Sequence, residues 1–193
     1  GEVANRIQAS ELQDKGVLAN CHVNVIQTQD HPQFKTYSEE LKWLTTDTTR
    51  MTWVANTIKD IATSGNTLIL VDRISAGELL EKKIPGSVFV SGSTKNMERK
   101  EQYDEISTAT NKVIIATYGV AAVGINIPRI FNLVLIEPGK SFIRVIQGIG
   151  RGIRKAEDKD SVQIWDITSS CKFAKRHLGA RKKFYKEANY PYN

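Results

Sequence analysis

Short, continuous runs of apolar residues recur through the second half of the chain. Residues 67–71 read Thr-Leu-Ile-Leu-Val, and similar runs occupy residues 87–91, 112–117, 132–136 and 162–167. A short run without polar alternation is typical of a strand that is covered on both faces of a sheet. Each run therefore predicts a buried strand.

Helical spacing separates several of these runs. Residues 75–83 and 96–108 fit helices, and strands that alternate with helical crossovers form a parallel sheet with helices on both faces. The pattern therefore predicts an α/β fold. Because ligands gather at the carboxyl ends of the strands in such sheets, the residues that follow each strand are the first candidates for binding.

The first third of the chain has a different pattern. It predicts a short strand at residues 22–27, a helix that begins at Ser38, and a second helix that Asp47 or Thr48 caps and that ends before residues 64–66.

The net charge of +6 is concentrated near the end of the chain. Residues 172–193 carry seven lysines and arginines against one glutamate. Apolar positions recur there every three or four residues and predict an amphipathic helix with a basic outer face; they are Phe173, His177, Ala180, Phe184 and Ala188. Such a face could neutralise nucleic-acid phosphates, but a solvated helix that only docks on the domain is at least as compatible with the pattern.

Other classes of function receive no support from the sequence. Cys21 and Cys171 lie far apart, and the three histidines form no cluster, so we predict no metal site. No apolar run approaches the roughly 20 residues that a membrane span needs, and the sequence begins without a signal-peptide pattern. We therefore expect no membrane partner and a cytoplasmic location.

The most informative stretch is residues 147–154, with the sequence Gln-Gly-Ile-Gly-Arg-Gly-Ile-Arg. At helical spacing Arg151 and Arg154 share one face. A guanidinium is permanently charged and offers a planar fork of donors, which suits a phosphate or a carboxylate. Taken alone, a solvated pair of surface arginines is about as good an interpretation.

Several segments together resemble the motifs of superfamily 2 helicases. Residues 114–117 and 124–128 resemble motif V, residues 147–154 resemble motif VI, and residues 67–73 resemble motif IV. Ser91-Gly92 with Arg99 resembles the intermediate motif IVa. Their order and spacing are similar to those of the second RecA-like domain of that superfamily.

The resemblance implies a fold and a division of the chain. The expected fold is a RecA-like three-layer sandwich with a mainly parallel sheet, an N-terminal helical segment and a basic C-terminal helix. Residues 1–66 would form a linker and an accessory helical segment, and residues 67–193 the second RecA-like domain.

The resemblance also assigns roles to single residues. Arg151 and Arg154 would face the γ-phosphate of ATP, with Arg154 as the preferred arginine finger and Gln147 as a polar neighbour in the same cleft. Gly124 and Asn126 would lie near the nucleotide ribose, although many relatives carry Asp where this chain has Asn. Four residues would line the track of the nucleic-acid backbone: Arg73, Gly92, Ser93 and Thr117.

Such a motor also needs a P-loop and an Asp-Glu motif that hold ATP and Mg²⁺. This chain contains no Gly-x-x-x-x-Gly-Lys-[Ser/Thr] sequence. We expect an N-terminal RecA-like domain of the same polypeptide to supply both motifs, and the present chain to be inactive alone. The resemblance to phage members of the superfamily implies ATP-dependent action on branched DNA or RNA–DNA hybrids in recombination, replication and repair, in the host cytoplasm.

Two other interpretations are compatible with the residues. The chain could be a non-enzymatic nucleic-acid-binding module with a RecA-like fold. It could also be a domain of an unrelated α/β enzyme, in which Arg151 and Arg154 form internal salt bridges to Glu137 or Asp166.

Overall fold

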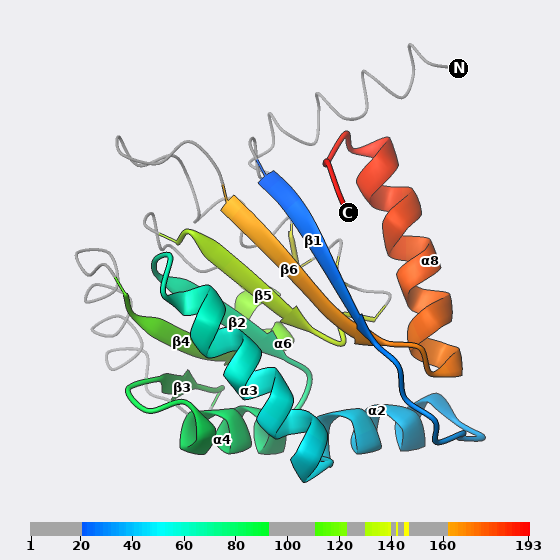
Figure 1. Cartoon of the computed structure of the whole chain (residues 1–193), viewed down its shortest axis with the longest axis horizontal. Helices are drawn as coiled ribbons and strands as arrows, with labels where there is room; N and C mark the ends of the chain where they lie inside the picture. Colours follow the sequence, from blue (N-terminus) through cyan, green and yellow to red (C-terminus); the bar gives the residue numbers. More distant parts are fainter. Residues whose placement is uncertain (1–20, 93–110, 123–129, 140–141, 143–144, 147–161) are drawn as a thin grey trace.

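The fold is built on one six-stranded sheet in which all paired strands are parallel (Figure 1). The computed structural model describes residues 21–92, 111–122, 130–139, 142, 145–146 and 162–193. The sheet has the order β1-β6-β5-β2-β4-β3. The strands are β1 (Cys21–Thr28), β2 (Thr67–Val71), β3 (Val88–Val90), β4 (Val113–Thr117), β5 (Asn132–Ile136) and β6 (Val162–Ser169).

Helices cover both faces of this sheet (Figure 1). The described helices are α2 (Tyr37–Thr46), α3 (Thr48–Ala62), α4 (Ile74–Lys83), α6 (Tyr118–Ala122) and α8 (Lys172–Glu187). Leu68 and Leu70 of β2 belong to the core that α6 and α8 complete, whereas Ile69 and Val71 belong to the core beneath α3 and α4. Successive side chains of a strand point to opposite faces, so β2 separates two apolar layers. The predicted α/β sandwich is confirmed.

The continuous apolar runs located the central strands accurately. Strands β2 and β5 have the predicted bounds, and every residue in both is buried. Strand β3 is shorter than predicted, and β6 continues past the predicted end at residue 167 to Ser169. The predicted helix at residues 96–108 lies outside the described residues. Helix α6, which begins directly after β4, was not predicted from the sequence.

Strand β1 joins the sheet through a partner that is distant in sequence. It pairs with β6 along its whole length, from Cys21 opposite Val162 to Thr28 opposite Ser169. Helix α3 packs against β2 in the same core. The elements on either side of the boundary that we expected at residue 66 therefore share one sheet and one core. Strand β1 belongs to the same sheet as the later strands, and α3 belongs to the same core as β2.

Helix α8 has the predicted amphipathic character but a different inner face. Arg181, which we counted with the basic outer face, is 1% exposed, and Ala180 is exposed. The Arg181 guanidinium donates two hydrogen bonds to Asp166 on β6, at 2.8 and 2.9 Å, and the Tyr185 hydroxyl donates a third at 2.7 Å. Asp166 is fully buried, so this pair anchors α8 to the sheet.

A carboxylate also fixes the beginning of α8. Glu40 of α2 is 1% exposed and accepts hydrogen bonds from the backbone amides of Phe173 and Ala174, at 2.9 and 2.8 Å. Amides in the first turn of a helix lack partners within the helix, and a negative charge there is favourable.

Among the described residues, no helix is long and apolar enough to cross a bilayer.

Candidate functional site

The carboxyl ends of the parallel strands lie along one edge of the sheet, and three predicted nucleic-acid contacts lie there. Thr117 ends β4 and is paired in register with Val71 of β2. Arg73 follows Val71 by two residues, and Gly92 follows the end of β3 by two residues. Strands β2, β4 and β3 are neighbours. The fold therefore brings these three residues to adjacent strand ends.

Each of the three has a local environment compatible with a phosphate contact. Thr117 accepts a hydrogen bond from the amide of Val120 at 3.3 Å, and a hydroxyl that accepts one bond can still donate its proton. A Cβ built on Gly92 has no described atom within 4 Å, so none of the described side chains blocks close approach to the backbone there.

Arg73 combines a side-chain charge with a helix terminus. It is the N-cap residue of α4, and its side chain makes no capping hydrogen bond. Its side chain is 35% exposed and lies 3.5 Å from the carboxylate of Asp72. The positive end of a helix and a partly exposed guanidinium together favour an anion at this edge.

The remaining predicted site residues lie outside the described residues. They are Ser93, Gly124, Asn126, Gln147, Arg151 and Arg154. The segment just before Gln147 is anchored, because Phe142, Val145 and Ile146 are all at most 4% exposed and belong to the core beneath α8. Asp104-Glu105 is the one adjacent Asp-Glu pair in the sequence, and it too lies outside the described residues, in a stretch predicted to be helical rather than after a strand.

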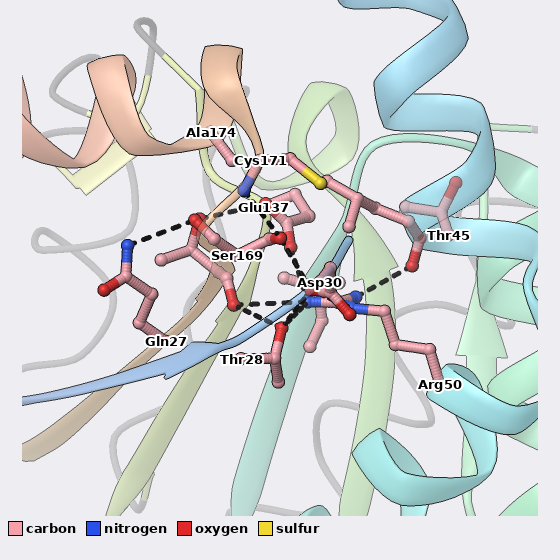
Figure 2. Close-up of polar contacts among 12 residues, drawn as sticks. Gln27, Thr28, Asp30, Thr45, Arg50, Glu137, Ser169, Cys171 and Ala174 are labelled. Atoms are coloured by element: carbon pink, nitrogen blue, oxygen red, sulfur yellow. Dashed lines mark hydrogen bonds and ion pairs between the residues drawn. The ribbon is translucent and has the colours of Figure 1, made fainter. Parts of the chain in front are cut away.

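The other half of the same edge holds a buried polar cluster that sequence analysis missed (Figure 2). The guanidinium of Arg50 on α3 donates to Glu137 at 2.8 Å, to the backbone carbonyl of Leu44 at 2.8 Å and to that of Thr168 at 3.2 Å. Its Nε lies 3.5 Å from a carboxylate oxygen of Asp30. Arg50 thereby ties α3 to the ends of β1, β5 and β6.

Glu137 directly follows β5 and is the strained member of this cluster. Its φ of 45° lies in the left-handed region, which is unfavourable for a residue with a side chain. Burial raises the pKa of Glu137 to about 7, against the opposing effects of the Arg50 charge and the hydrogen bond from Thr168. The contacts with Arg50 and Thr168 hold this carboxylate in the core and stabilise the bend that ends β5.

These two buried pairs bear on one alternative interpretation. It placed Arg151 and Arg154 against Glu137 or Asp166, but each of those carboxylates binds another arginine in the described structure. The sequence does contain a signal for the true partners. Arg50 is followed by Met51 and Val54 on the apolar face of α3, and Arg181 lies in the apolar arc of α8, so each cation falls on the apolar side of its helix.

Comparison with known proteins agrees with the motif series. Residues 49–156 match the family described as helicase conserved C-terminal domain. The chain is 28% identical over 195 residues to the ATP-dependent DNA helicase uvsW of Enterobacteria phage T4, which covers 95% of this chain and 39% of that protein. It is 33% identical over 104 residues to putative helicase 22 of a Sulfolobus islandicus filamentous virus, covering 52% of this chain and 18% of that protein.

Solved structures show the same fold. The crystal structure of T4 UvsW has a TM-score of 0.79 at 23% identity and covers 91% of this chain and 41% of that one. The C-terminal domain of the DEAD-box protein Dbp5 has a TM-score of 0.59 at 17% identity, with 91% of each chain covered. The chain thus spans about two fifths of the length of its phage relative.

Proposed function

The chain belongs to the family of helicase conserved C-terminal domains, and from this premise we propose that it is the second RecA-like motor domain of an ATP-dependent DNA helicase or translocase. The observation that supports this proposal most directly is the arrangement of Arg73, Gly92 and Thr117 on three adjacent strand ends. Donors on consecutive strands suit a backbone that passes along the edge of the sheet. Contacts of this kind position a strand without reading its sequence.

In this proposal the ATP site is completed between two domains. ATP and Mg²⁺ are held mainly by an N-terminal RecA-like domain, and Arg151 and Arg154 of the present chain approach the γ-phosphate when the domains close, with Gln147 in the same cleft and Gly124 and Asn126 near the ribose. A cation that meets the charge developing on the transferring phosphoryl group lowers the barrier to its transfer. Alternating closure and opening, with both domains on one strand, moves the protein along the nucleic acid.

The proposed substrate is branched DNA or an RNA–DNA hybrid, handled in recombination, replication and repair. The likeness to a phage DNA helicase over 95% of this chain supports DNA as the nucleic acid. The buried cluster around Arg50 supports the mechanical role, because it joins α3 and three strand ends into one rigid edge.

The experiment that tests the proposal is ATPase activity with and without branched DNA. It compares this chain alone, the N-terminal half alone, and the two halves joined in one polypeptide. The proposal predicts DNA-stimulated turnover only for the joined protein. Robust turnover by this chain alone would show a complete phosphate site here. A folded, joined protein without turnover would instead favour a non-enzymatic nucleic-acid-binding module.

A further inference from the structure

Helix α8 carries six exposed cations that the proposed strand track does not use. They are Lys172, Lys175, Arg176, Lys182, Lys183 and Lys186. At about 100° per residue, these positions fall within an arc of roughly 120°, opposite the arc that packs on the sheet. The row is about 21 Å long, because 14 helical steps separate its first and last residues. We call this row the α8 basic stripe.

The stripe is held rigidly. Glu40 binds the first amides of α8, the Arg181–Asp166 pair anchors the middle of the helix, and Tyr185 donates to the same carboxylate. Further along, the backbone amide of Val23 on β1 donates to the carbonyl of Pro191 at 2.7 Å, which ties the segment after α8 to the edge of the sheet. The six cations are therefore presented on a fixed scaffold, and little backbone entropy is lost when they bind.

We propose that the α8 basic stripe is a second nucleic-acid contact, which binds the phosphate backbone of a duplex. The inference rests on the proposed function only in taking nucleic acid as the substrate. A straight row of about 21 Å, laid along the axis of B-DNA, spans the rise of roughly six base pairs, at about 3.4 Å each. Gly179 lies at the centre of the stripe, and a Cβ built on it has no described atom within 4 Å, so a phosphate can approach the helix there.

A duplex fits the stripe better than a single strand does. Proteins that grip single strands use exposed aromatic rings on which bases stack. The exposed large apolar side chains of the described residues are Tyr37, Trp53, Ile74 and Tyr192, and none lies in the stripe. The nearby ring of Phe173 is half-buried, with the cations of Lys172 and Arg176 5.5 and 5.7 Å from its centre. Charge without a stacking platform is suited to a phosphate backbone.

The stripe also lies away from the proposed strand track. Helix α8 packs against β6, and two to four strand spacings separate β6 from the three strands β2, β4 and β3 that carry the track. At about 4.8 Å per spacing these distances are roughly 10 to 19 Å. Figure 1 shows α8 and β3 toward opposite ends of the sheet. A branched substrate has a duplex arm beside the strand that the motor grips, and the stripe is placed to hold such an arm.

A lipid surface is the other large anionic partner, and the packing of α8 argues against it. Helices that lie on membranes insert an apolar face into the acyl boundary. The apolar face of α8 is already covered, because Leu178, Phe184 and Tyr185 are buried against the sheet. The exposed face of α8 carries no large apolar side chain that could insert into a bilayer.

The test measures how the affinity of this chain for a blunt duplex of about 20 base pairs depends on salt. The variant combines Lys175→Gln, Lys182→Gln, Lys183→Gln and Lys186→Gln. The control removes the same charge from exposed lysines elsewhere, through Lys35→Gln, Lys42→Gln, Lys59→Gln and Lys82→Gln. Far-UV circular dichroism and thermal midpoints check folding, and the double variant of Lys182 and Lys183 repeats the measurement with a smaller change. No ATP or N-terminal domain is needed, so the outcome is independent of the ATPase test.

Each phosphate contact contributes about 0.9 to the slope of log affinity against log salt. The stripe variant should therefore have a slope shallower by about 3.6, and the double variant by about 1.8, while the control keeps the wild-type slope to within one unit. Equal losses in variant and control would show a general effect of net charge and would overturn the proposal. An unchanged salt dependence in the stripe variant would also overturn the proposal. So would a loss of affinity that is seen with single-stranded DNA or phosphatidylserine vesicles but not with the duplex.

Discussion

Replacing Arg181 with alanine should destabilise the fold far more than the loss of a surface cation would. The side chains of Arg181 and Asp166 are 1% and 0% exposed. Arg181→Ala leaves the carboxylate buried with one remaining hydrogen bond, from the Tyr185 hydroxyl. Removing one partner of a buried ion pair costs about 3–5 kcal/mol, because the other charge stays desolvated without compensation.

Denaturant unfolding followed by circular dichroism measures this loss directly. For a domain of this size it corresponds to a fall in the thermal midpoint of roughly 10 °C. Lys182→Ala is the matched control, since Lys182 is the neighbouring cation on the exposed face and should change the free energy of unfolding by less than about 0.5 kcal/mol.

A compensated variant separates the buried charge from the packing. Combining Arg181→Met with Asp166→Leu and Tyr185→Phe removes all the polar groups of the pair, and such apolar replacements are often neutral or stabilising. We expect this triple variant to be more stable than Arg181→Ala. A loss below about 1 kcal/mol for Arg181→Ala would refute the buried pair as the anchor of α8.

Further predictions concern single positions. Gly77→Ala should destabilise the protein by about 1–2 kcal/mol in denaturant unfolding, because its Cβ would lie 2.4 Å from the ring of Phe89, whereas Gly179→Ala, with open space around it, should stabilise α8 by about 0.5–1 kcal/mol. Burial raises the pKa of Glu137 to about 7 from 4.5, so the folded state holds a proton that the unfolded state has lost between these values. The free energy of unfolding of the wild type should therefore fall, relative to Glu137→Gln, as pH rises from about 4.5 to 7; a constant difference would contradict this. In the proposed two-domain protein, Thr117→Ala should weaken DNA binding equally for all sequences, and a change in sequence preference, measured by competition binding, would contradict a backbone contact.

Local patterns were sufficient for the central strands and for the edge that holds the candidate site. Strands β2 and β5 are buried on both faces, so their sequences are uniformly apolar and their bounds follow from the run alone. The rule that ligands gather at the carboxyl ends of parallel strands then placed Arg73, Gly92 and Thr117 at one edge, as the structure has them.

These local patterns could not predict contacts between segments that are distant in sequence. The pairing of β1 with β6 joins residues about 140 positions apart, and the sequence of neither strand indicates which strand it pairs with. Arg50 lies 87 residues from Glu137, and a charged residue on a helix is ordinarily expected to face solvent. Helix α6 was missed because its five residues are too few to show helical periodicity.

The measurement that tests the central claim most directly is the effect of Arg154→Ala in the proposed two-domain protein. DNA-stimulated ATP turnover and DNA affinity are measured on the same preparations, with Arg154→Lys to separate the charge from the guanidinium fork. Lys59→Ala, at an exposed lysine outside both proposed DNA contacts, controls for the loss of a cation. The account predicts that Arg154→Ala lowers turnover by on the order of 10³-fold while DNA affinity stays within a few-fold, and that Lys59→Ala leaves turnover largely intact. Turnover within a few-fold of the wild type for Arg154→Ala would contradict the role of Arg154 as the arginine finger.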